Sequence, residues 1–268
     1  MPDARKYSSK LANTHILIIG GTSGIGFCVA EASVEAGAHV TISSSNASRV
    51  STSVSALQGS YPSAASRIQG IVADLSSAET LEGEIARLFE ETVAGQGGEK
   101  RLLLDHVVFT AGDALSVVRL ADMNMGTVLQ AGQIRFFAPL LIAKYIPRYV
   151  VAEHTSSYTI TTGSISEKPI SDWSVVASFA GGLHAMVRNL ALDLKPVRVN
   201  GVSPGVVDTE LWKMGEEEKK AFMAECAKRT VTGRAGRPED VAESFMGVLR
   251  DGNMSGSVVR TDGGGLIM

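Results

Sequence analysis

Short apolar segments alternate with longer amphipathic ones along most of the chain. Nearly continuous apolar, β-branched runs predict strands over residues 15–19, 38–43, 68–73, 106–110, 158–162, 197–202 and 257–260. Helices are expected between them, at residues 25–36, 78–93 and 125–149. Strands that are apolar on both faces and separated by helices predict a parallel sheet covered on both sides. The expected fold class is α/β, a doubly wound parallel sheet with helices on both faces.

Length and composition favour a single domain spanning residues 1–268. A chain of 268 residues with 44% hydrophobic composition buries one sizeable core. The glycine-rich stretch 95–98 is too short to link two domains. The charged stretch 214–229 follows a predicted strand end and is expected to form either a mobile lid or a solvated helix.

The net charge and the cysteine content limit the classes of binding partner and the cellular compartment that we expect. A net charge of -3 gives no basic field for nucleic acid or an anionic membrane. Residues 1–10 are polar, and the most apolar later stretch, 139–146, is interrupted by Lys144. Cys28 and Cys226 are too few and too far apart for a disulfide framework or a metal cluster. We therefore expect a cytoplasmic protein that binds no metal, no nucleic acid and no membrane.

A glycine-rich turn joins the first predicted strand to the first predicted helix. It reads Ile19-Gly-Gly-Thr-Ser-Gly-Ile-Gly26. Glycines let a pyrophosphate approach backbone N–H groups, and the positive end of the helix dipole favours the anion. The turn therefore predicts a dinucleotide site formed by Gly20, Thr22, Ser23, Gly24, Ile25 and Gly26.

The end of the second predicted strand bears on the choice between NADP and NAD. An NAD-selective site places a carboxylate there, which bonds the ribose hydroxyls. This chain instead has Ser44, Ser45 and Asn46, with Arg49 nearby. NADP is the predicted cofactor, because no carboxylate repels its 2′-phosphate. The alternative is that these residues merely cap the next helix.

The glycine spacing and four later blocks resemble the short-chain dehydrogenase/reductase family. The blocks are Asp74-Leu75, Thr110-Ala-Gly112, Arg198-Val-Asn-Gly-Val-Ser-Pro-Gly205 and Gly236-Arg-Pro-Glu-Asp-Val241. The resemblance implies a single Rossmann-type domain that assembles as a homodimer or homotetramer. It also implies that the cofactor cleft is lined by Asp74, Leu75, Thr110, Ala111, Gly112, Pro204, Gly205, Val206 and Thr209.

At the positions that match the family's proton-transfer residues, this chain has other residues. Val176 and Ala180 fall where the family has its catalytic tyrosine and lysine, Ile134 falls near the helix asparagine, and only the serine, Ser164, is kept. Hydride delivery to a ketone creates an alkoxide that the tyrosine normally protonates. A protonated imine instead becomes a neutral amine without an acid, and a cycloaddition needs only reacting ends held together. Imine reduction or cyclisation is therefore favoured over ketone reduction.

Residues 132–144 and 162–174 resemble a narrower branch, the fungal reductase/Diels–Alderases of bicyclo[2.2.2]diazaoctane indole alkaloid biosynthesis, of the malbrancheamide and paraherquamide type. The resemblance implies NADPH-dependent reduction of an iminium and an intramolecular [4+2] cycloaddition of an apolar, nitrogen-containing small molecule. The Pro-Asp-Pro-Gly-Trp motif of that branch reads Pro169-Ile-Ser-Asp-Trp173 here. Its carboxylate has therefore become Ile170.

The candidate catalytic residues are Ser164, Arg135, Asp172 and Trp173. Arg135 is expected either to hydrogen-bond a substrate carbonyl or to form a salt bridge at a subunit contact. Asp172 either replaces the lost carboxylate or caps its loop. Trp173 offers a flat apolar wall to an indole or serves only in packing. His184, one turn beyond Ala180, is a further candidate base.

Three functions remain open on this sequence. The first is an NADPH-binding enzyme that reduces an imine or iminium, promotes a cycloaddition, or does both. The second keeps the cofactor redox-silent in a cyclase or isomerase. The third is a non-catalytic pseudoenzyme that binds NADP and works through a partner surface.

Overall fold

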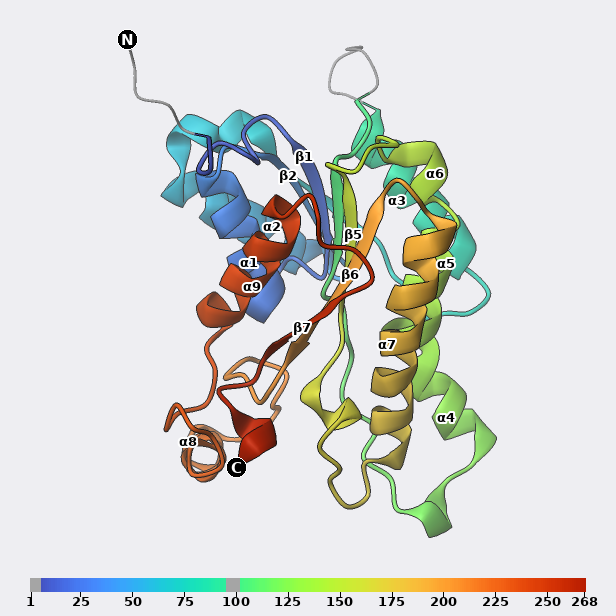
Figure 1. The fold of residues 1–268 in the computed structure, drawn as a ribbon, viewed down its shortest axis with the longest axis vertical. Helices are drawn as coiled ribbons and strands as arrows, with labels where there is room; N and C mark the ends of the chain where they lie inside the picture. The colour runs from blue at the N-terminus through green and yellow to red at the C-terminus, as the bar shows by residue number, and fades with distance from the viewer. Residues whose placement is uncertain (1–5, 95–101) are drawn as a thin grey trace.

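A computed structural model describes residues 6–94 and 102–268, so the stretch 95–98 and residues 1–5 lie outside the described part. The described residues form one seven-stranded parallel sheet in the order β3-β2-β1-β4-β5-β6-β7 (Figure 1). The strands are β1 (His15–Ile19), β2 (His39–Ser44), β3 (Ile68–Val72), β4 (His106–Phe109), β5 (Ser157–Thr161), β6 (Arg198–Pro204) and β7 (Val258–Thr261). The predicted α/β fold class is confirmed, and each predicted strand is present within two residues of its expected ends.

Helices connect the strands and cover both faces of the sheet. They are α1 (Gly24–Glu35), α2 (Ala47–Ser60), α3 (Leu81–Val93), α4 (Met125–Gly132), α5 (Ala138–Ala143), α6 (Ile146–Tyr149), α7 (Ser174–Asp193), α8 (Glu216–Ala227) and α9 (Pro238–Arg250). Short helical turns are η1 (Pro62–Arg67), η2 (Leu120–Asp122), the π-helical η3 (Gln133–Phe137), η4 (Ser164–Ser166) and η5 (Gly265–Ile267). Helices α1, α2 and α9 lie on one face, and α3, α5 and α7 lie on the other (Figure 1).

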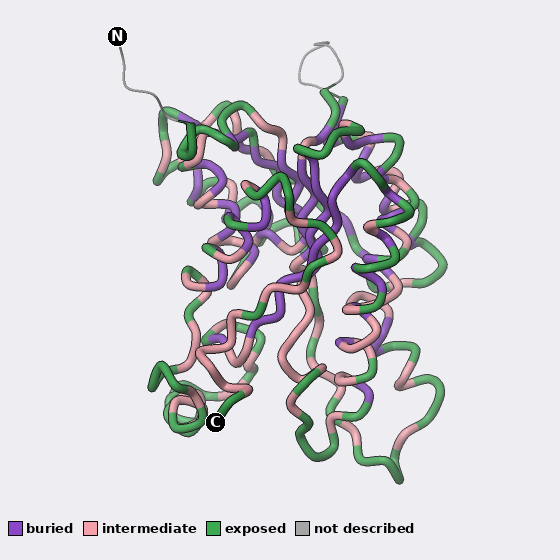
Figure 2. The backbone as a smooth tube through the Cα atoms, in the orientation of Figure 1, coloured by how far each residue is buried: buried purple, intermediate pink, exposed green. Residues whose placement is uncertain are grey.

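Strand β1 shows why both faces are apolar. Successive side chains of a strand point to opposite sides. Ile16 and Ile18 therefore join the core beneath α1, α2 and α9, whereas Leu17 and Ile19 join the core beneath α3, α5 and α7. Figure 2 shows the buried positions gathered on the strands and on the inner sides of these helices. A doubly covered sheet follows from this pattern.

The helix expected over residues 125–149 is not continuous, which corrects the prediction. The α-helical pattern of α4 gives way to the π-helical η3, and α5 follows directly. Pro139 and Pro147 each stand near the start of a new segment, where the missing proline N–H costs no helical hydrogen bond. Helix α2 was not among the predicted elements, because its serine-rich sequence carries little apolar periodicity.

Arg198 of the Arg198-Val-Asn block is a structural residue. It is almost fully buried, at 3% exposure, and donates hydrogen bonds to five backbone carbonyl groups, those of His154, Thr155, Val248, Leu249 and Met254. Asn200 donates to the carbonyl of Met254 as well. A buried guanidinium is tolerated only when its donors are satisfied. These contacts join β6 to the end of α9 and to the turn before β5.

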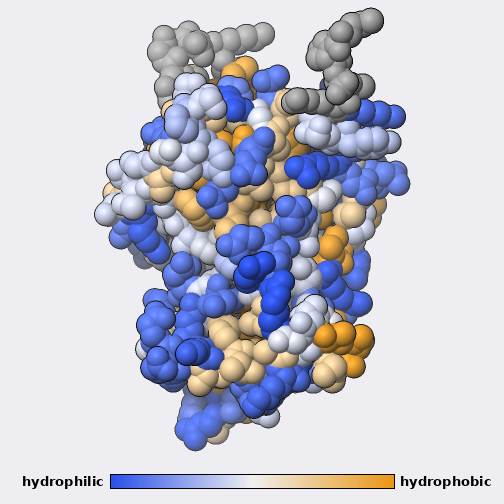
Figure 3. Space-filling view, turned by 90° about the vertical axis from the view of Figure 1, so that its left-hand side faces the viewer, coloured by the Kyte–Doolittle hydropathy of each residue, from blue (hydrophilic) through white to orange (hydrophobic). Residues whose placement is uncertain are grey.

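The surface over α1, α2 and α9 is mostly hydrophilic, and its apolar atoms fall into separate patches (Figure 3). Within residues 6–94 and 102–268, one helix, α7, has the length and apolar composition of a membrane span. Its Leu183, Val187 and Leu190 are buried in the core against the sheet. Core helices of this length and composition meet the same criterion, so the finding assigns no membrane.

Candidate active site

A cavity of about 1180 Å³ opens at the carboxyl ends of the strands. The residues that follow β1, β2, β3, β4, β5 and β6 all contribute to its wall. The sheet order reverses between β1 and β4, and ligands of open α/β sheets bind outside the strand ends at such a point. Helix α8 and the C-terminal residues lie at this end of the molecule (Figure 1).

The glycine turn forms one wall of the cavity. Gly20 has a φ of +94° and Gly24 a φ of +49°, backbone conformations that side chains rarely adopt. A Cβ on Gly26 would lie 2.2 Å from the carbonyl oxygen of Gly20, so the turn packs without room for a methyl group. Ser23, the N-cap of α1, makes no side-chain capping bond. The free N–H groups of this helix end face the cavity and fit the pyrophosphate of a dinucleotide.

The end of β2 presents polar side chains to the cavity. Ser44, Ser45 and Arg49 line the wall, whereas Asn46 lies outside it. The Asn46 side chain instead accepts a hydrogen bond from the Arg49 backbone N–H (2.9 Å) and so caps α2. The sequence alternative of a helix cap therefore applies to Asn46. Residues 43–49 include no carboxylate, and this composition fits a 2′-phosphate.

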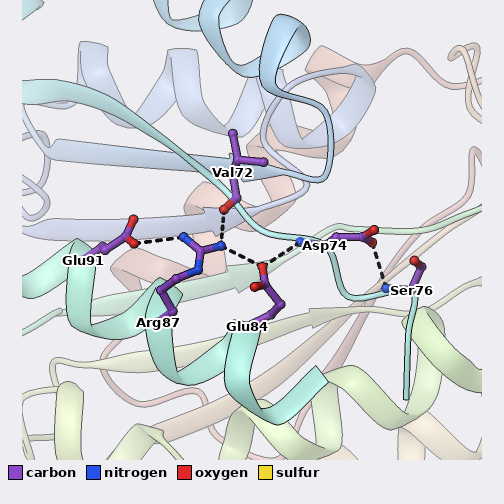
Figure 4. Close-up of polar contacts among 6 residues, drawn as sticks. All are labelled: Val72, Asp74, Ser76, Glu84, Arg87 and Glu91. Atoms are coloured by element: carbon purple, nitrogen blue, oxygen red, sulfur yellow. Dashed lines mark hydrogen bonds and ion pairs between the residues drawn. The ribbon is translucent and has the colours of Figure 1, made fainter. Parts of the chain in front are cut away.

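Asp74 and Leu75 line the cavity after β3, and a charged network on α3 supports their loop (Figure 4). Arg87 donates to Glu84 (2.7 Å) and to the carbonyl of Val72 (2.6 Å). Glu84 accepts from the backbone N–H of Asp74 (3.2 Å), and Arg87 lowers the pKa of Glu84 by hydrogen bonding. The loop that carries Asp74 and Leu75 is thus held by residues that lie outside the cavity wall.

The ends of β4 and β6 complete the cofactor side of the cavity. The wall here includes Thr110, Ala111, Gly112, Pro204, Gly205, Val206 and Thr209. The Thr110 hydroxyl donates to the carbonyl of Ile19 (3.1 Å), which ties β4 to β1. Glu210 also lines the wall, 3.5 Å from where a Cβ of Gly24 would stand. The Glu210 carboxylate therefore lies beside the glycine turn.

Val176 and Ala180 of α7 both line the cavity. Ala180 is buried, and its carbonyl accepts a hydrogen bond from the Thr162 hydroxyl (3.0 Å), which fixes this turn of α7 to the end of β5. Ser164 follows on η4 and also lines the wall. The positions where the family carries its phenol and ammonium are therefore apolar surface beside the strand ends.

The described wall residues include neither a tyrosine nor a histidine. Tyr158 is fully buried, and its hydroxyl donates to the carbonyl of Pro139 (2.9 Å); burial raises its pKa well above the ordinary value. Lys168 and Lys213 do line the wall. The Lys168 ammonium donates to the carbonyls of Gly265 and Met268 near the C-terminus.

Arg135 reaches the cavity from the π-helical η3. A π-helical turn adds a residue and rotates the side chains that follow, and such turns occur often at functional sites. The Arg135 guanidinium covers Gly112 and pairs with the Asp113 carboxylate (Nε to Oδ1, 3.1 Å). Burial lowers the pKa of Arg135, and the charge of Asp113 opposes that shift. The predicted alternatives for Arg135 were a substrate contact or a salt bridge; a salt bridge exists, but within the cavity wall.

Asp172 does not reach the cavity. It is exposed, has a φ of +66°, and its carbonyl accepts from the Val118 N–H (3.1 Å). Its neighbour Trp173 and the exposed Ile170 both line the wall. His184 also lies outside the wall, where its Nε2 is 3.1 Å from the Ser166 hydroxyl and burial lowers its pKa.

Sequence reasoning missed an aromatic pair at the mouth of the cavity. Trp212 and Phe222 line the wall with ring centroids 4.8 Å apart. The Trp212 indole N–H donates to the carbonyl of Val207 (2.8 Å), so its polar edge is fixed while its face stays apolar. Helix α8 carries Phe222 and Cys226 on the cavity side and has no fully buried residue. The charged stretch 214–229 is thus largely helical and borders the cavity, and its role as a mobile lid stays a prediction. Trp212 lies in the sequence just before this charged helix, and a tryptophan at that position could have indicated an aromatic cavity wall.

Metal ligation has no support in the described part of the chain. Residues 6–94 and 102–268 include no group of three or more histidine, cysteine, aspartate or glutamate side chains placed to hold a metal ion. Cys28 and Cys226 are both free. The cavity wall thus presents a helix N-terminus, a hydroxyl-rich strand end, a partly exposed ion pair and aromatic surface.

Comparison with known proteins identifies the family. A family model described as an SDR-like Rossmann domain matches residues 7–268. The chain belongs to the short-chain dehydrogenase/reductase family. It is 42% identical to the short-chain dehydrogenase/reductase fsr5 of Gibberella fujikuroi and 36% identical to malC of Malbranchea aurantiaca, with 100% of each chain covered in both cases.

A solved structure supports the same assignment at the level of coordinates. The MalC reductase/Diels-Alderase from Malbranchea aurantiaca superposes with a TM-score of 0.90 at 35% identity, covering 98% of this chain and 100% of that one. The short-chain dehydrogenase/reductase family consists of NAD(P)-dependent enzymes, and the residues around the α1 N-terminus fit such a cofactor. The resemblance drawn from the glycine turn and the later blocks is confirmed for the family.

Proposed function

We propose that this short-chain dehydrogenase/reductase uses NADPH to reduce an imine or iminium, promotes an intramolecular [4+2] cycloaddition, or does both, in fungal alkaloid biosynthesis. The observation that carries the proposal is the apolar surface of Val176 and Ala180 on the cavity wall. Ketone reduction needs a proton at the developing alkoxide, whereas an iminium needs none. The substrate we propose is an apolar small molecule that contains nitrogen.

The chain supplies binding, orientation and exclusion of water. The α1 N-terminus holds the anion, and NADPH supplies the hydride when it is bound. Arg135 presents a planar donor to a substrate carbonyl beside Gly112. Trp173 and Trp212 offer flat apolar faces that position a fused-ring substrate and favour close approach of reacting ends.

Two lines of support come from relatives and from the cofactor side. The MalC structure bears the words reductase and Diels-Alderase in its printed description, and its chain matches this one from end to end. Ser44, Ser45 and Arg49 favour NADPH over NADH, because hydroxyl and guanidinium donors suit a 2′-phosphate.

A stopped-flow experiment tests the proposal. The enzyme with NADPH is mixed with 2-methyl-3,4-dihydroisoquinolinium, a permanent iminium, and with 1-tetralone, a neutral ketone that places its electrophilic carbon in the same ring position. Oxidation of NADPH by the iminium, and slow or absent oxidation by the ketone, is the expected result. A ketone that reacts as fast as the iminium would refute the proposed chemistry.

The two alternative functions give different outcomes with cyclic dienes that carry an indole. Cycloadduct formation with unchanged nicotinamide absorbance indicates a redox-silent cyclase. Tight NADP binding without turnover of any imine or diene indicates a pseudoenzyme. Neither alternative has a specific structural observation in its favour.

We also propose that the protein is a cytoplasmic homodimer or homotetramer. The side of the molecule around η2, α4 and α5 exposes large apolar residues, namely Val117, Leu120, Met125, Leu129 and Leu140. Apolar surface of this kind is typical of subunit contacts. Light scattering after size-exclusion chromatography measures the mass, and a fluorescent fusion reports the compartment.

A further inference from the structure

The Arg135–Asp113 ion pair lies on the cavity wall, where no sequence motif predicted a carboxylate. Nε of Arg135 lies 3.1 Å from Oδ1 of Asp113, and Nη2 of Arg135 also donates to the Asp113 backbone carbonyl. The side chains are 26% and 35% exposed, respectively. Both residues line the cavity wall. The pair is therefore neither a surface ion pair nor a buried core pair, and a ligand in the cavity meets it.

The guanidinium of this pair is placed at the end of β4. A Cβ built on Gly112 would stand 2.8 Å from Cζ, Nη1 and Nη2 of Arg135, so the planar group lies directly over that glycine. Gly112 lines the cavity between the glycine turn after β1 and Ser164 after β5. A ligand that reaches this end of the cavity lies beside a fixed positive charge.

Asp113 is the carboxylate that balances this charge. The other described wall carboxylates have separate places: Asp74 on the loop after β3, Glu210 near Gly24, and Asp262, which accepts from the N–H groups of Gly264 and Leu266. A lone guanidinium beside a partly dehydrated ligand repels other cations strongly, because water no longer screens it. Asp113 removes most of that repulsion while it fixes the orientation of Arg135.

We propose that Asp113 is a positioning residue that neutralises Arg135 and thereby lets the pocket accept a positive charge beside Gly112. Two ligands bring such a charge, the oxidised nicotinamide ring of NADP⁺ and an iminium substrate. The iminium half rests on the proposed function. The claim about the nicotinamide ring requires only the NAD(P) site of the family. An experiment can therefore contradict one of the two claims without contradicting the other.

Binding of the two cofactor forms tests the nicotinamide half without turnover. Dissociation constants for NADP⁺ and NADPH are measured by calorimetry for the wild type, Asp113→Asn, Arg135→Gln and the double variant. Asp113→Asn is expected to weaken NADP⁺ relative to NADPH by about tenfold, because the unbalanced guanidinium repels the cationic ring. Arg135→Gln shifts the ratio the opposite way, and the charge-balanced double variant returns it to within about twofold of the wild type.

A merely structural role of Asp113 predicts a different result. Local disorder would weaken both cofactor forms equally, and removing Arg135 as well would not restore their ratio. Either result overturns the proposal, as does wild-type protein that binds neither form. Asp122→Asn is the matched control, because Asp122 forms an exposed pair with Arg119 away from the cavity wall and should leave the ratio unchanged.

The iminium half is tested with an isosteric pair of probes on the NADP⁺ complex. The cation 2-methyl-3,4-dihydroisoquinolinium is compared with neutral 3-methyl-1,2-dihydronaphthalene, which replaces the charged nitrogen with carbon. Asp113→Asn is expected to lower the affinity for the cation about tenfold and to leave the neutral probe within about twofold. Equal losses, or no binding preference for either probe in any variant, would overturn this half. If the cofactor ratio still shifts in that case, the charge balance stands and the iminium assignment fails.

Discussion

The two ends of the cavity are built in different ways. At the cofactor end, the wall is mainly backbone: the glycine turn after β1 and the strand ends that pack against it at close distances. At the chemical end, the wall is made of side chains that come from η3, η4, α7 and α8. The first end suits the pyrophosphate that dinucleotides share, whereas the second faces the reacting group of a substrate.

The difference explains how the chemistry of the site can change while the fold is kept. A backbone site depends on where the chain turns, so the sequence must keep glycine at fixed spacings. A side-chain site keeps its scaffold when a residue is exchanged. Replacement of a phenol and an ammonium by Val176 and Ala180 therefore alters the chemistry without altering the fold.

The largest expected effect is at the backbone end. Gly26→Ala places a Cβ 2.2 Å from the Gly20 carbonyl oxygen and 2.4 Å from the Thr110 hydroxyl oxygen. The turn must open, and the free energy of unfolding should fall by about 3 kcal/mol, measured by urea denaturation. Gly181→Ala on α7 has nothing within 4 Å and should instead gain about 0.5–1 kcal/mol. Equal free energies of unfolding for the two variants would contradict the conclusion that the glycine turn has no room for a side chain.

At the chemical end, Arg135→Ala should lower kcat/KM about 100-fold for an iminium that also carries an amide carbonyl, because the guanidinium donor that orients this carbonyl is lost. Affinity for NADPH, whose ring is neutral, should change by no more than about threefold. Steady-state kinetics and calorimetry give the two numbers. Arg119→Ala, on an exposed residue, is the control. An unchanged rate would remove Arg135 from the substrate site.

The 2′-phosphate of the cofactor is the next test. Arg49→Glu places a negative charge where NADPH carries a dianionic phosphate, so NADPH affinity should fall about tenfold or more. NADH lacks that group and serves as the internal control. Fluorescence titration of both reduced cofactors measures the ratio. Equal losses for NADPH and NADH would place Arg49 away from the phosphate.

A smaller effect is expected at the loop that carries Asp74. Glu84→Gln weakens the bond that holds the Asp74 N–H from outside the cavity, so affinity for NADPH should fall about threefold with kcat unchanged. Glu91→Gln is matched to it, since Glu91 also bonds Arg87 but does not contact the loop (Figure 4). Comparable losses in both variants would mean that helix charge alone sets the affinity.

The smallest effect is expected where the family's acid has been lost. Val176→Tyr with Ala180→Lys should not raise the rate of iminium reduction, because the amine product needs no proton from the enzyme. Val176→Phe with Ala180→Met matches the added bulk without the acid. The absorbance of reduced nicotinamide follows both reactions. A large gain in the tyrosine and lysine variant alone would show that the native chemistry uses an acid.

Particular residues show which parts of the site could be predicted from the sequence. The glycine turn, the strand ends and the aligned blocks predicted the cofactor wall, and the structure brings those residues together with the exception of Asn46. Asp172 was a candidate because it lies near Ile170 in sequence, but a turn with positive φ directs its backbone to Val118 and leaves the side chain outside the wall. Proximity in sequence does not give direction in a loop.

The sequence itself determined where the strands lie along the chain and where the glycine turn falls, and its family resemblance indicated the loss of an acid at positions 176 and 180. Nearly continuous apolar runs and glycine spacing are local properties, and each residue's neighbours along the chain are enough to define them. Only the tertiary structure decided that Asp113 meets Arg135, and that Trp212 and Phe222 face the same cavity. These contacts join residues from different elements, and a π-helical turn within an otherwise regular helix sets the direction of Arg135. Such directions depend on packing between elements, which no local pattern contains.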